Sequence, residues 1–259
     1  MSSSHLHHEQ SGPEDGAPVV LLGSSLGTTL EMWTPAVATL ERRHRIVRFD
    51  HRGHGRSPLP PGPCEIADLG GDVLALLDRL RLERVSYVGV SLGGMVGMWL
   101  AAHAPERIER LVCVCSSAYL PPPEVWAARA ASVREAGSVG VLSDSVLERW
   151  FTRAYAEAHP DVMAWMDTML CECPAEGYAA CCGVIEHLDL RGDLGLIRAP
   201  TLVIAAAEDP ATPPEHSATI ADGVPGARLE LLPQGAHLAA IERADEVVVL
   251  IERHLEAAA

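Results

Sequence analysis

A serine flanked by glycines follows an apolar run near the middle of the chain. The run covers Val85–Val90, and the pattern Gly89-x-Ser91-x-Gly93 ends it and opens a helical stretch. This pattern is typical of a nucleophile elbow, a turn so tight that only small side chains fit two residues before and after the serine. We therefore expect a strained backbone at Ser91 and an exposed hydroxyl at the start of a helix. The alternative is a serine that only caps a helix.

An acid and a histidine follow the serine in the order that this chemistry requires. A serine hydroxyl is a weak nucleophile until a base takes its proton. Asp209 comes just after the apolar run Leu202–Ala206, and its neighbour Glu208 is the alternative acid. His237 lies in a glycine-containing loop before the last helical stretch, a context that no other histidine shares. Ser91, Asp209 and His237 are therefore the predicted catalytic triad.

Backbone N–H groups near the serine must stabilise the negative oxygen that forms when a carbonyl is attacked. The residue after the nucleophile, Leu92, is one expected donor. The second donor should come from the loop Gly23–Gly27, which follows the first core strand. The register favours Ser25 for this oxyanion hole, with Leu26 as the alternative.

Short apolar runs alternate with helical stretches along most of the chain. Continuous apolar strands are typical of parallel sheets that are covered on both faces, so we expect an α/β protein with a mostly parallel sheet flanked by helices. The stretch "HLHHEQSG" at 5–12 fits a short edge strand better than an interrupted histidine tag. The other expected strands are Val19–Gly23, Ile46–Asp50, Val85–Val90, Leu111–Cys115, Leu202–Ala206 and Arg228–Leu232.

Four helices are predicted between or after these strands. One has an apolar face, and a second begins beside Ser91 and ends before Pro105. A third has Thr212 as its N-cap and Pro213 at its first position, and the last covers about Glu242–His254. The apolar face of the first helix consists of Ile66, Leu69, Val73, Leu76, Leu77 and Leu80.

The alternation breaks at residues 120–190. This segment opens with three prolines, has a helical pattern and holds Trp126, Trp150 and Trp165. We therefore expect a helical cap at 120–190, inserted into an α/β-type core of residues 1–119 and 191–259.

The composition excludes some classes of partner. The formal net charge is −15, and all 20 basic residues are arginine. An acidic surface opposes binding to nucleic acids and to anionic membrane surfaces. No apolar run approaches the ~20 residues that span a bilayer, and the first residues lack the apolar core of a signal peptide. We therefore expect a cytoplasmic protein with no nucleic-acid or membrane partner.

The seven cysteines do not indicate a metal site. No Cys-x-x-Cys spacing occurs, and adjacent or alternate cysteines make poor tetrahedral sites. We expect reduced, buried side chains and neither a metal nor a cofactor. The close pairs are Cys113 and Cys115, Cys171 and Cys173, and Cys181 and Cys182.

The stretch "FDHRGHGRS" at 49–57 allows two interpretations. Its two histidines and Arg52 could form a metal or anion site. We favour a structural loop that supports the elbow, in which Asp50 and Arg52 bond to backbone groups.

These motifs resemble the α/β-hydrolase superfamily along nearly the whole chain. They are most similar to the 3-oxoadipate enol-lactonases of the β-ketoadipate pathway, which open a carboxymethyl enol-lactone during bacterial breakdown of aromatic compounds. The stretches that carry the resemblance are "SLGTTLEMW" at 25–33, "DHRGHGRSP" at 50–58, "GVSLGGMVGMWLAAHAPERIERLV" at 89–112, "LERWFT" at 147–152, "YAACC" at 178–182 and "AEDPATPP" at 207–214.

The resemblance implies an α/β-hydrolase fold with an inserted cap, acyl transfer without a metal or cofactor, and a small anionic lactone as substrate. Because the chain has no lysine, an arginine must hold the carboxylate of such a substrate. Arg134 and Arg149 are favoured, with Trp126 and Trp150 as pocket walls, although each could be an ordinary surface charge or cap-core residue. The full set of cap candidates is Arg129, Arg134, Arg149 and Arg153.

Two other classes of function remain as alternatives. Another carboxylesterase, a C–C bond hydrolase or a perhydrolase could share the same fold and triad. A non-catalytic ligand-binding receptor would not need a complete Ser91, Asp209 and His237 set. Haloalkane dehalogenases and epoxide hydrolases are disfavoured because they use aspartate where this chain has Ser91.

Overall fold

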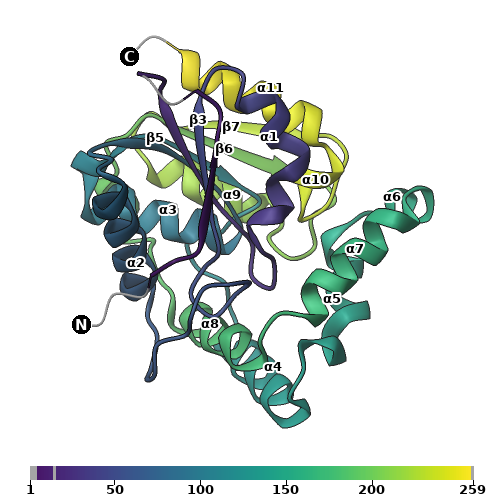
Figure 1. Cartoon of the computed structure of the whole chain (residues 1–259). Helices are drawn as coiled ribbons and strands as arrows, with labels where there is room; N and C mark the ends of the chain where they lie inside the picture. The colour runs from purple at the N-terminus through teal and green to yellow at the C-terminus, as the bar shows by residue number, and fades with distance from the viewer. Residues whose placement is uncertain (1–4, 14–15, 258–259) are drawn as a thin grey trace.

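A seven-stranded sheet forms the centre of the molecule (Figure 1). The computed structural model describes residues 5–13 and 16–257. The strand order is β1-β3-β2-β4-β5-β6-β7, with β1 antiparallel to β3 and the other neighbours parallel. The strands are β1 (His8–Ser11), β2 (Val19–Gly23), β3 (Arg45–Phe49), β4 (Val85–Val90), β5 (Ile108–Val114), β6 (Thr201–Ala206) and β7 (Arg228–Leu232).

The sheet confirms the predicted strands, including the short edge strand at the N-terminus. Every residue of β4 and β6 is buried, as expected for parallel strands with helices on both faces. In contrast, four of the five residues of β7 are exposed, because β7 is an edge strand. The apolar runs therefore identified the strands but did not distinguish the central ones from the edge.

Helices cover the sheet and fill the segment between β5 and β6. α3 packs on β4 and β5 and against α2, while α1 packs against α11. The helices are α1 (Thr34–Leu40), α2 (Ile66–Leu80), α3 (Leu92–His103), α4 (Pro123–Ala136), α5 (Ser143–Trp150), α6 (Arg153–Ala158), α7 (Pro160–Cys171), α8 (Ala175–His187), α9 (Pro214–Gly223), α10 (Ala239–Glu242) and α11 (Ala244–Glu256). Short 3₁₀ turns are η1 (Leu30–Trp33), η2 (Pro105–Arg107), η3 (Val139–Leu142) and η4 (Leu194–Leu196).

Two helix predictions are wrong in detail. α9 begins at Pro214, one residue later than expected, and Thr212 is not its N-cap. The Thr212 hydroxyl instead donates to Asp209, so a tertiary contact uses the group that was assigned to capping. The last helix, α11, begins at Ala244, two residues later than expected, because the chain leaves helical geometry at Arg243 after the separate short helix α10.

The chain between β5 and β6 contains helices α4 to α8 and no strand within residues 115–200, all of which are described. A single antiparallel bridge between Tyr119 and Asp189 joins the two ends of this segment. In Figure 1 the helices form a teal-to-green group beside the sheet. We propose that residues 120–190 form a cap over the sheet domain.

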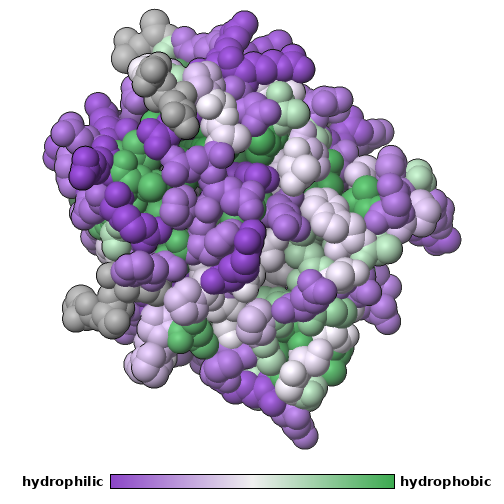
Figure 2. All heavy atoms as spheres, viewed as in Figure 1, coloured by the Kyte–Doolittle hydropathy of each residue, from purple (hydrophilic) through white to green (hydrophobic). Residues whose placement is uncertain are grey.

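The surface is mostly hydrophilic on the face shown in Figure 2, and hydrophobic residues show in separate patches, some over the cap helices and others on the opposite side of this view. Among the described residues, no helix is both long enough and apolar enough to cross a membrane.

Candidate active site

Ser91 lies in the turn between β4 and α3, with φ 52° and ψ −114°. A positive φ at a residue with a side chain costs of order 1–3 kcal/mol and is held only by its surroundings. Here the Ser91 N–H donates to Val114 O at 3.0 Å, and the Ser116 hydroxyl donates to Ser91 O at 2.8 Å. Ser91 thus has the strained backbone expected of an elbow at the carboxyl edge of the sheet.

The glycines on both sides of Ser91 are required by close backbone contacts. A Cβ atom at Gly89 would lie 2.3 Å from the carbonyl carbon and oxygen of Gly93. A Cβ at Gly93 would lie 2.3 Å from the O of Gly23, the last residue of β2, and 3.0 Å from Ser24 O in the loop that follows. The elbow therefore packs directly against the expected oxyanion loop.

His237 and Asp209 form a buried pair after β7 and β6. His237 Nδ1 lies 2.9 Å from Asp209 Oδ2 and 3.2 Å from Oδ1, which is consistent with Nδ1–H donating to the carboxylate. The Asp209 oxygens also accept the N–H of Ala211 at 2.8 Å, the N–H of Thr212 at 3.0 Å and the Thr212 hydroxyl at 2.7 Å. The structure thus brings Asp209 to the histidine, whereas Glu208 is exposed.

The surroundings favour an ionised Asp209. Burial raises the pKa of its carboxyl, but the charge of His237 and the hydrogen bonds from His237 and Thr212 outweigh burial, so the pKa lies below its ordinary value. An ionised Asp209 can hold the imidazole tautomer that carries a proton on Nδ1 and leaves Nε2 free to act as a base.

One cavity joins the elbow, the histidine and the cap. Trp126 and Arg129 reach it from α4, while Arg149 and Trp150 reach it from the end of α5. Leu92 does not line the cavity with its side chain, but as the first residue of α3 it has no intrahelical partner for its N–H. The full lining is Ser25, Leu26, Ser91, Leu120, Trp126, Arg129, Val146, Arg149, Trp150, Tyr178, Ile185, Ala211, Thr212 and His237.

The oxyanion loop corrects the predicted donor. The Ser25 N–H points at the sulfur of Met32, with N and Sδ 3.3 Å apart, so it is not free to hold an oxyanion. The N–H groups of Leu26 and Leu92 have no acceptor within the part of the chain that the structure describes. We therefore replace Ser25 by Leu26, the alternative, as the second proposed donor.

The loop at 49–57 is structural, but the contacts below support the oxyanion loop and not the elbow that was predicted. His54 Nε2 accepts the N–H of Gly27 at 3.0 Å, and His51 Nε2 lies 3.0 Å from Ser24 O. Asp50 Oδ1 accepts the N–H of Leu30 at 2.8 Å. Burial lowers the pKa of His51 to about 3 and also lowers the pKa of His54, which favours neutral rings that can hold these bonds. Arg52 donates to the backbone oxygen of Asp68 at 2.9 Å, as predicted, and also anchors the loop to α2 through Asp72 at 2.6 Å.

The cap arginines separate into two groups. Arg129 lies 5.0 Å from the centre of the Trp126 ring and 3.3 Å from the Tyr178 hydroxyl. Arg149 lies at the mouth of the cavity on the exposed side of α5. Neither guanidinium forms an ion pair with any carboxylate among residues 5–13 and 16–257. Both charges are therefore available to an anion in the cavity.

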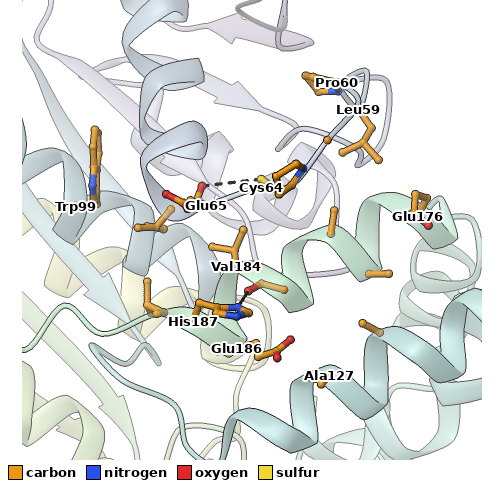
Figure 3. Close-up of a pocket in the computed structure, with 18 of the residues that line it drawn as sticks. Leu59, Pro60, Cys64, Glu65, Trp99, Ala127, Glu176, Val184, Glu186 and His187 are labelled. Carbon is orange, nitrogen blue, oxygen red and sulfur yellow. Dashed lines mark hydrogen bonds between the residues drawn. The ribbon is translucent and has the colours of Figure 1, made fainter. Parts of the chain in front are cut away.

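The structure places Arg134 outside the cavity that holds Ser91 and His237, so its position does not support the predicted role in substrate binding. Arg134 pairs with Glu176 at 2.8 Å and lines a different, larger hollow on the other side of α4 and α8, where Glu176 is drawn in Figure 3. Arg153 is 92% exposed and pairs with Glu157. Arg129 lines the cavity instead, together with Trp126 three residues before it on the same helix face.

Thr212 and Tyr178 also line the cavity but were not predicted as site residues. Tyr178 lay in the quoted motif "YAACC", and Thr212 lay in "AEDPATPP". The motifs marked these positions, but neither motif alone indicates which residue faces the cavity.

Comparisons with known proteins agree with this architecture. The profile of the alpha/beta hydrolase fold matches residues 18–135. The chain is 36% identical over 226 residues to 3-oxoadipate enol-lactonase 2 of Acinetobacter baylyi, covering 87% of this chain and 84% of that protein. It is also 36% identical over 257 residues to a putative carbamate hydrolase, RutD, of Variovorax paradoxus, covering 92% and 91%.

A solved structure extends the similarity to the whole chain. The crystal structure of the enol-lactonase from Burkholderia xenovorans LB400 superposes with a TM-score of 0.96 and 40% sequence identity, covering 99% of this chain and 98% of that one. With this level of similarity along its full length, the chain belongs to the α/β-hydrolase family.

Proposed function

We propose that the protein is a serine hydrolase that opens 3-oxoadipate enol-lactone to 3-oxoadipate. The observation that carries the proposal is the shared cavity, in which the strained Ser91, the Asp209-bound His237 and two unpaired cap arginines meet. The names of the relatives from Acinetobacter baylyi and Burkholderia xenovorans support the choice of lactone.

In the proposed reaction Ser91 Oγ attacks the lactone carbonyl while His237 Nε2 takes its proton. Asp209 orients the ring and stabilises its positive charge. The N–H groups of Leu26 and Leu92 hold the oxyanion. Collapse of the intermediate breaks the ring C–O bond, and the enol oxygen leaves with the proton from His237.

A second half-reaction restores the enzyme. Water attacks the acyl-enzyme while His237 accepts one proton of that water, and His237 passes this proton to Ser91 Oγ when the bond between Oγ and the acyl carbon breaks. The acyl group departs as a carboxylic acid, which loses its proton to solvent and becomes a carboxylate. The released enol then becomes the ketone. An enolate is a better leaving group than an alkoxide, so the lactone requires less help for ring opening than a simple ester does.

The cavity walls support an anionic substrate. Trp126 and Trp150 provide apolar faces, and Arg129 and Arg149 provide charges that a carboxylate can bind. This local positive charge offsets the net charge of −15, which repels an anion at long range.

A spectrophotometric assay on enol-lactone generated in situ tests the proposal. Parallel assays use p-nitrophenyl acetate and, because of the RutD relative, carbamate. We expect kcat/KM for the enol-lactone to exceed both others by orders of magnitude. Strong activity only on the simple ester would support another carboxylesterase, and strong activity only on carbamate would support a carbamate hydrolase.

A further inference from the structure

A carboxylate outside the triad binds the loop that carries His237. Glu242 is the last residue of α10, shortly after His237. Its Oε2 accepts the N–H of Ala236 at 3.0 Å and the N–H of Thr152 at 3.2 Å. Its Oε1 accepts the hydroxyl of Thr152. One carboxylate therefore joins the residue before His237 to the cap.

The residue after His237 is joined to the same part of the cap. The N–H of Leu238 donates to Trp150 O at 2.9 Å. Both chain neighbours of His237 are thus held by residues 150–152, directly or through Glu242. Trp150 and the preceding Arg149 line the cavity, so the same short segment holds the backbone on both sides of His237 and also faces the cavity.

The environment of Glu242 favours strong hydrogen bonds between the His237 loop and the cap. The carboxylate is half-buried, and it forms no ion pair with a cation in the described part of the chain. Its neighbour Arg243 pairs instead with Glu246. Three N–H and O–H donors therefore share the charge of Glu242, and hydrogen bonds to an ionised acceptor are roughly twice as strong as neutral ones.

We propose that Glu242 is a positioning residue that couples the imidazole of His237 to the substrate-facing end of α5. The inference rests on the proposed function, in which His237 is the base and Arg149 and Trp150 face the substrate. Hydrogen bonds that only held the cap against the core could involve any residue of the core. These bonds end on the two residues that flank His237.

Substitutions at Glu242 and Thr152 remove different numbers of these hydrogen bonds. Glu242→Ala removes every acceptor, while Glu242→Gln keeps one oxygen for the two N–H donors and turns its amide toward the Thr152 hydroxyl. Thr152→Val removes the hydroxyl bond to Glu242 together with the N-cap bond that the same hydroxyl accepts from the N–H of Tyr155, and Thr152→Ser keeps both. Asp245→Asn, an exposed acid in the first turn of α11, is the matched control for the loss of one negative charge.

We expect kcat on the enol-lactone to fall about 10- to 100-fold in Glu242→Ala, because small displacements of catalytic groups cost this much. The kcat values of Glu242→Gln and Thr152→Val should lie between that of Glu242→Ala and that of the wild type. Thr152→Ser and Asp245→Asn should match the wild type. Because Arg149 would move with the segment, KM should rise more for the carboxylated lactone than for a neutral ester.

The rate at which a fluorophosphonate labels Ser91 separates the two roles of Glu242. A contact that only held the cap in place would not change this rate, whereas a contact that positions His237 would. All rates are normalised to the folded fraction, and Glu242→Gln and Thr152→Val carry the test if Glu242→Ala does not fold. Slower labelling in step with kcat supports the coupling. Labelling and kcat within twofold of the wild type in these variants overturn it. If the wild type itself is not labelled at Ser91, the proposed function fails and the coupling fails with it.

Discussion

Asp209 is held by four donor groups, of which His237 is only one. Asp209→Asn keeps the shape but presents an amide to His237, which favours the wrong imidazole tautomer. We expect kcat to fall by about 10⁴, as in other triads. Glu208→Gln is the control, because Glu208 is exposed and should leave kcat unchanged. Steady-state kinetics on the enol-lactone measures both, and a larger loss in Glu208→Gln would contradict the assignment of the acid.

Arg129 and Arg149 differ from Arg134 in what they face, although all three lie in the cap. Replacing Arg129 or Arg149 by alanine should raise KM for the carboxylated lactone about ten- to a hundredfold, because a lost charge-assisted hydrogen bond costs roughly 1.5–3 kcal/mol. KM for a neutral ester should change much less. Arg134→Ala, on the same helix as Arg129, removes an exposed pair with Glu176 and should change neither value. Equal losses on both substrates would show that these arginines do not bind the carboxylate.

At the scale of elements, the elbow depends on close backbone contact of α3 with the ends of β4 and β2. Gly89→Ala would place a Cβ 2.3 Å from backbone atoms of Gly93, which cannot move without shifting Ser91. We expect the free energy of unfolding to fall by about 3 kcal/mol and kcat per folded molecule to fall as well. Chemical denaturation and kinetics measure the two effects.

Gly183 in α8 is the matched control for this glycine prediction. A Cβ there meets nothing within 4 Å, and the residue is helical. Gly183→Ala should therefore raise the free energy of unfolding by about 0.5–1 kcal/mol, because alanine favours helix. A similar loss of stability in both variants would argue against a special contact at Gly89.

The elements were largely predictable from the sequence because their signals are local. The elbow, the strand runs and the apolar face of α2 each depend on spacing within a few residues. What failed depends on contacts across the chain. The N–H of Ser25 is directed at the Met32 sulfur, and the hydroxyl of Thr212 is directed at Asp209. The inward face of α4 is set by packing against α8, so the choice of Arg134 over Arg129 could not be corrected from periodicity alone.

At the scale of the whole molecule, the net charge of −15 contrasts with several neutral, buried histidines. Burial lowers the pKa of His51 to about 3, lowers that of His54, and lowers that of His254 to about 4. Such groups keep their ordinary pKa of about 6.5 in the unfolded chain. Between these values the unfolded chain binds protons that the folded protein does not, so stability is lost as pH falls below about 6.5.

His51 isolates one part of this loss. With a pKa of about 3 in the folded protein, His51 contributes about 2 kcal/mol less stability at pH 5 than at pH 7. His51→Gln keeps an N–H donor for Ser24 O but cannot titrate. We therefore expect the difference in free energy of unfolding between pH 7 and pH 5 to shrink by about 2 kcal/mol in this variant, measured by urea denaturation. Any loss of stability common to both pH values cancels in the difference.

The pH window and a second variant make this test specific. The carboxyl of Asp209 also has a lowered pKa, but its contribution is lost only as pH falls below its ordinary value of 3.8, outside the window between pH 7 and pH 5. His187→Gln replaces an exposed histidine and should leave the pH difference as it is in the wild type. If His51→Gln also keeps the wild-type pH difference, His51 is not the buried neutral ring that holds the Ser24 carbonyl, and the support of the oxyanion loop must come from His54 and Asp50.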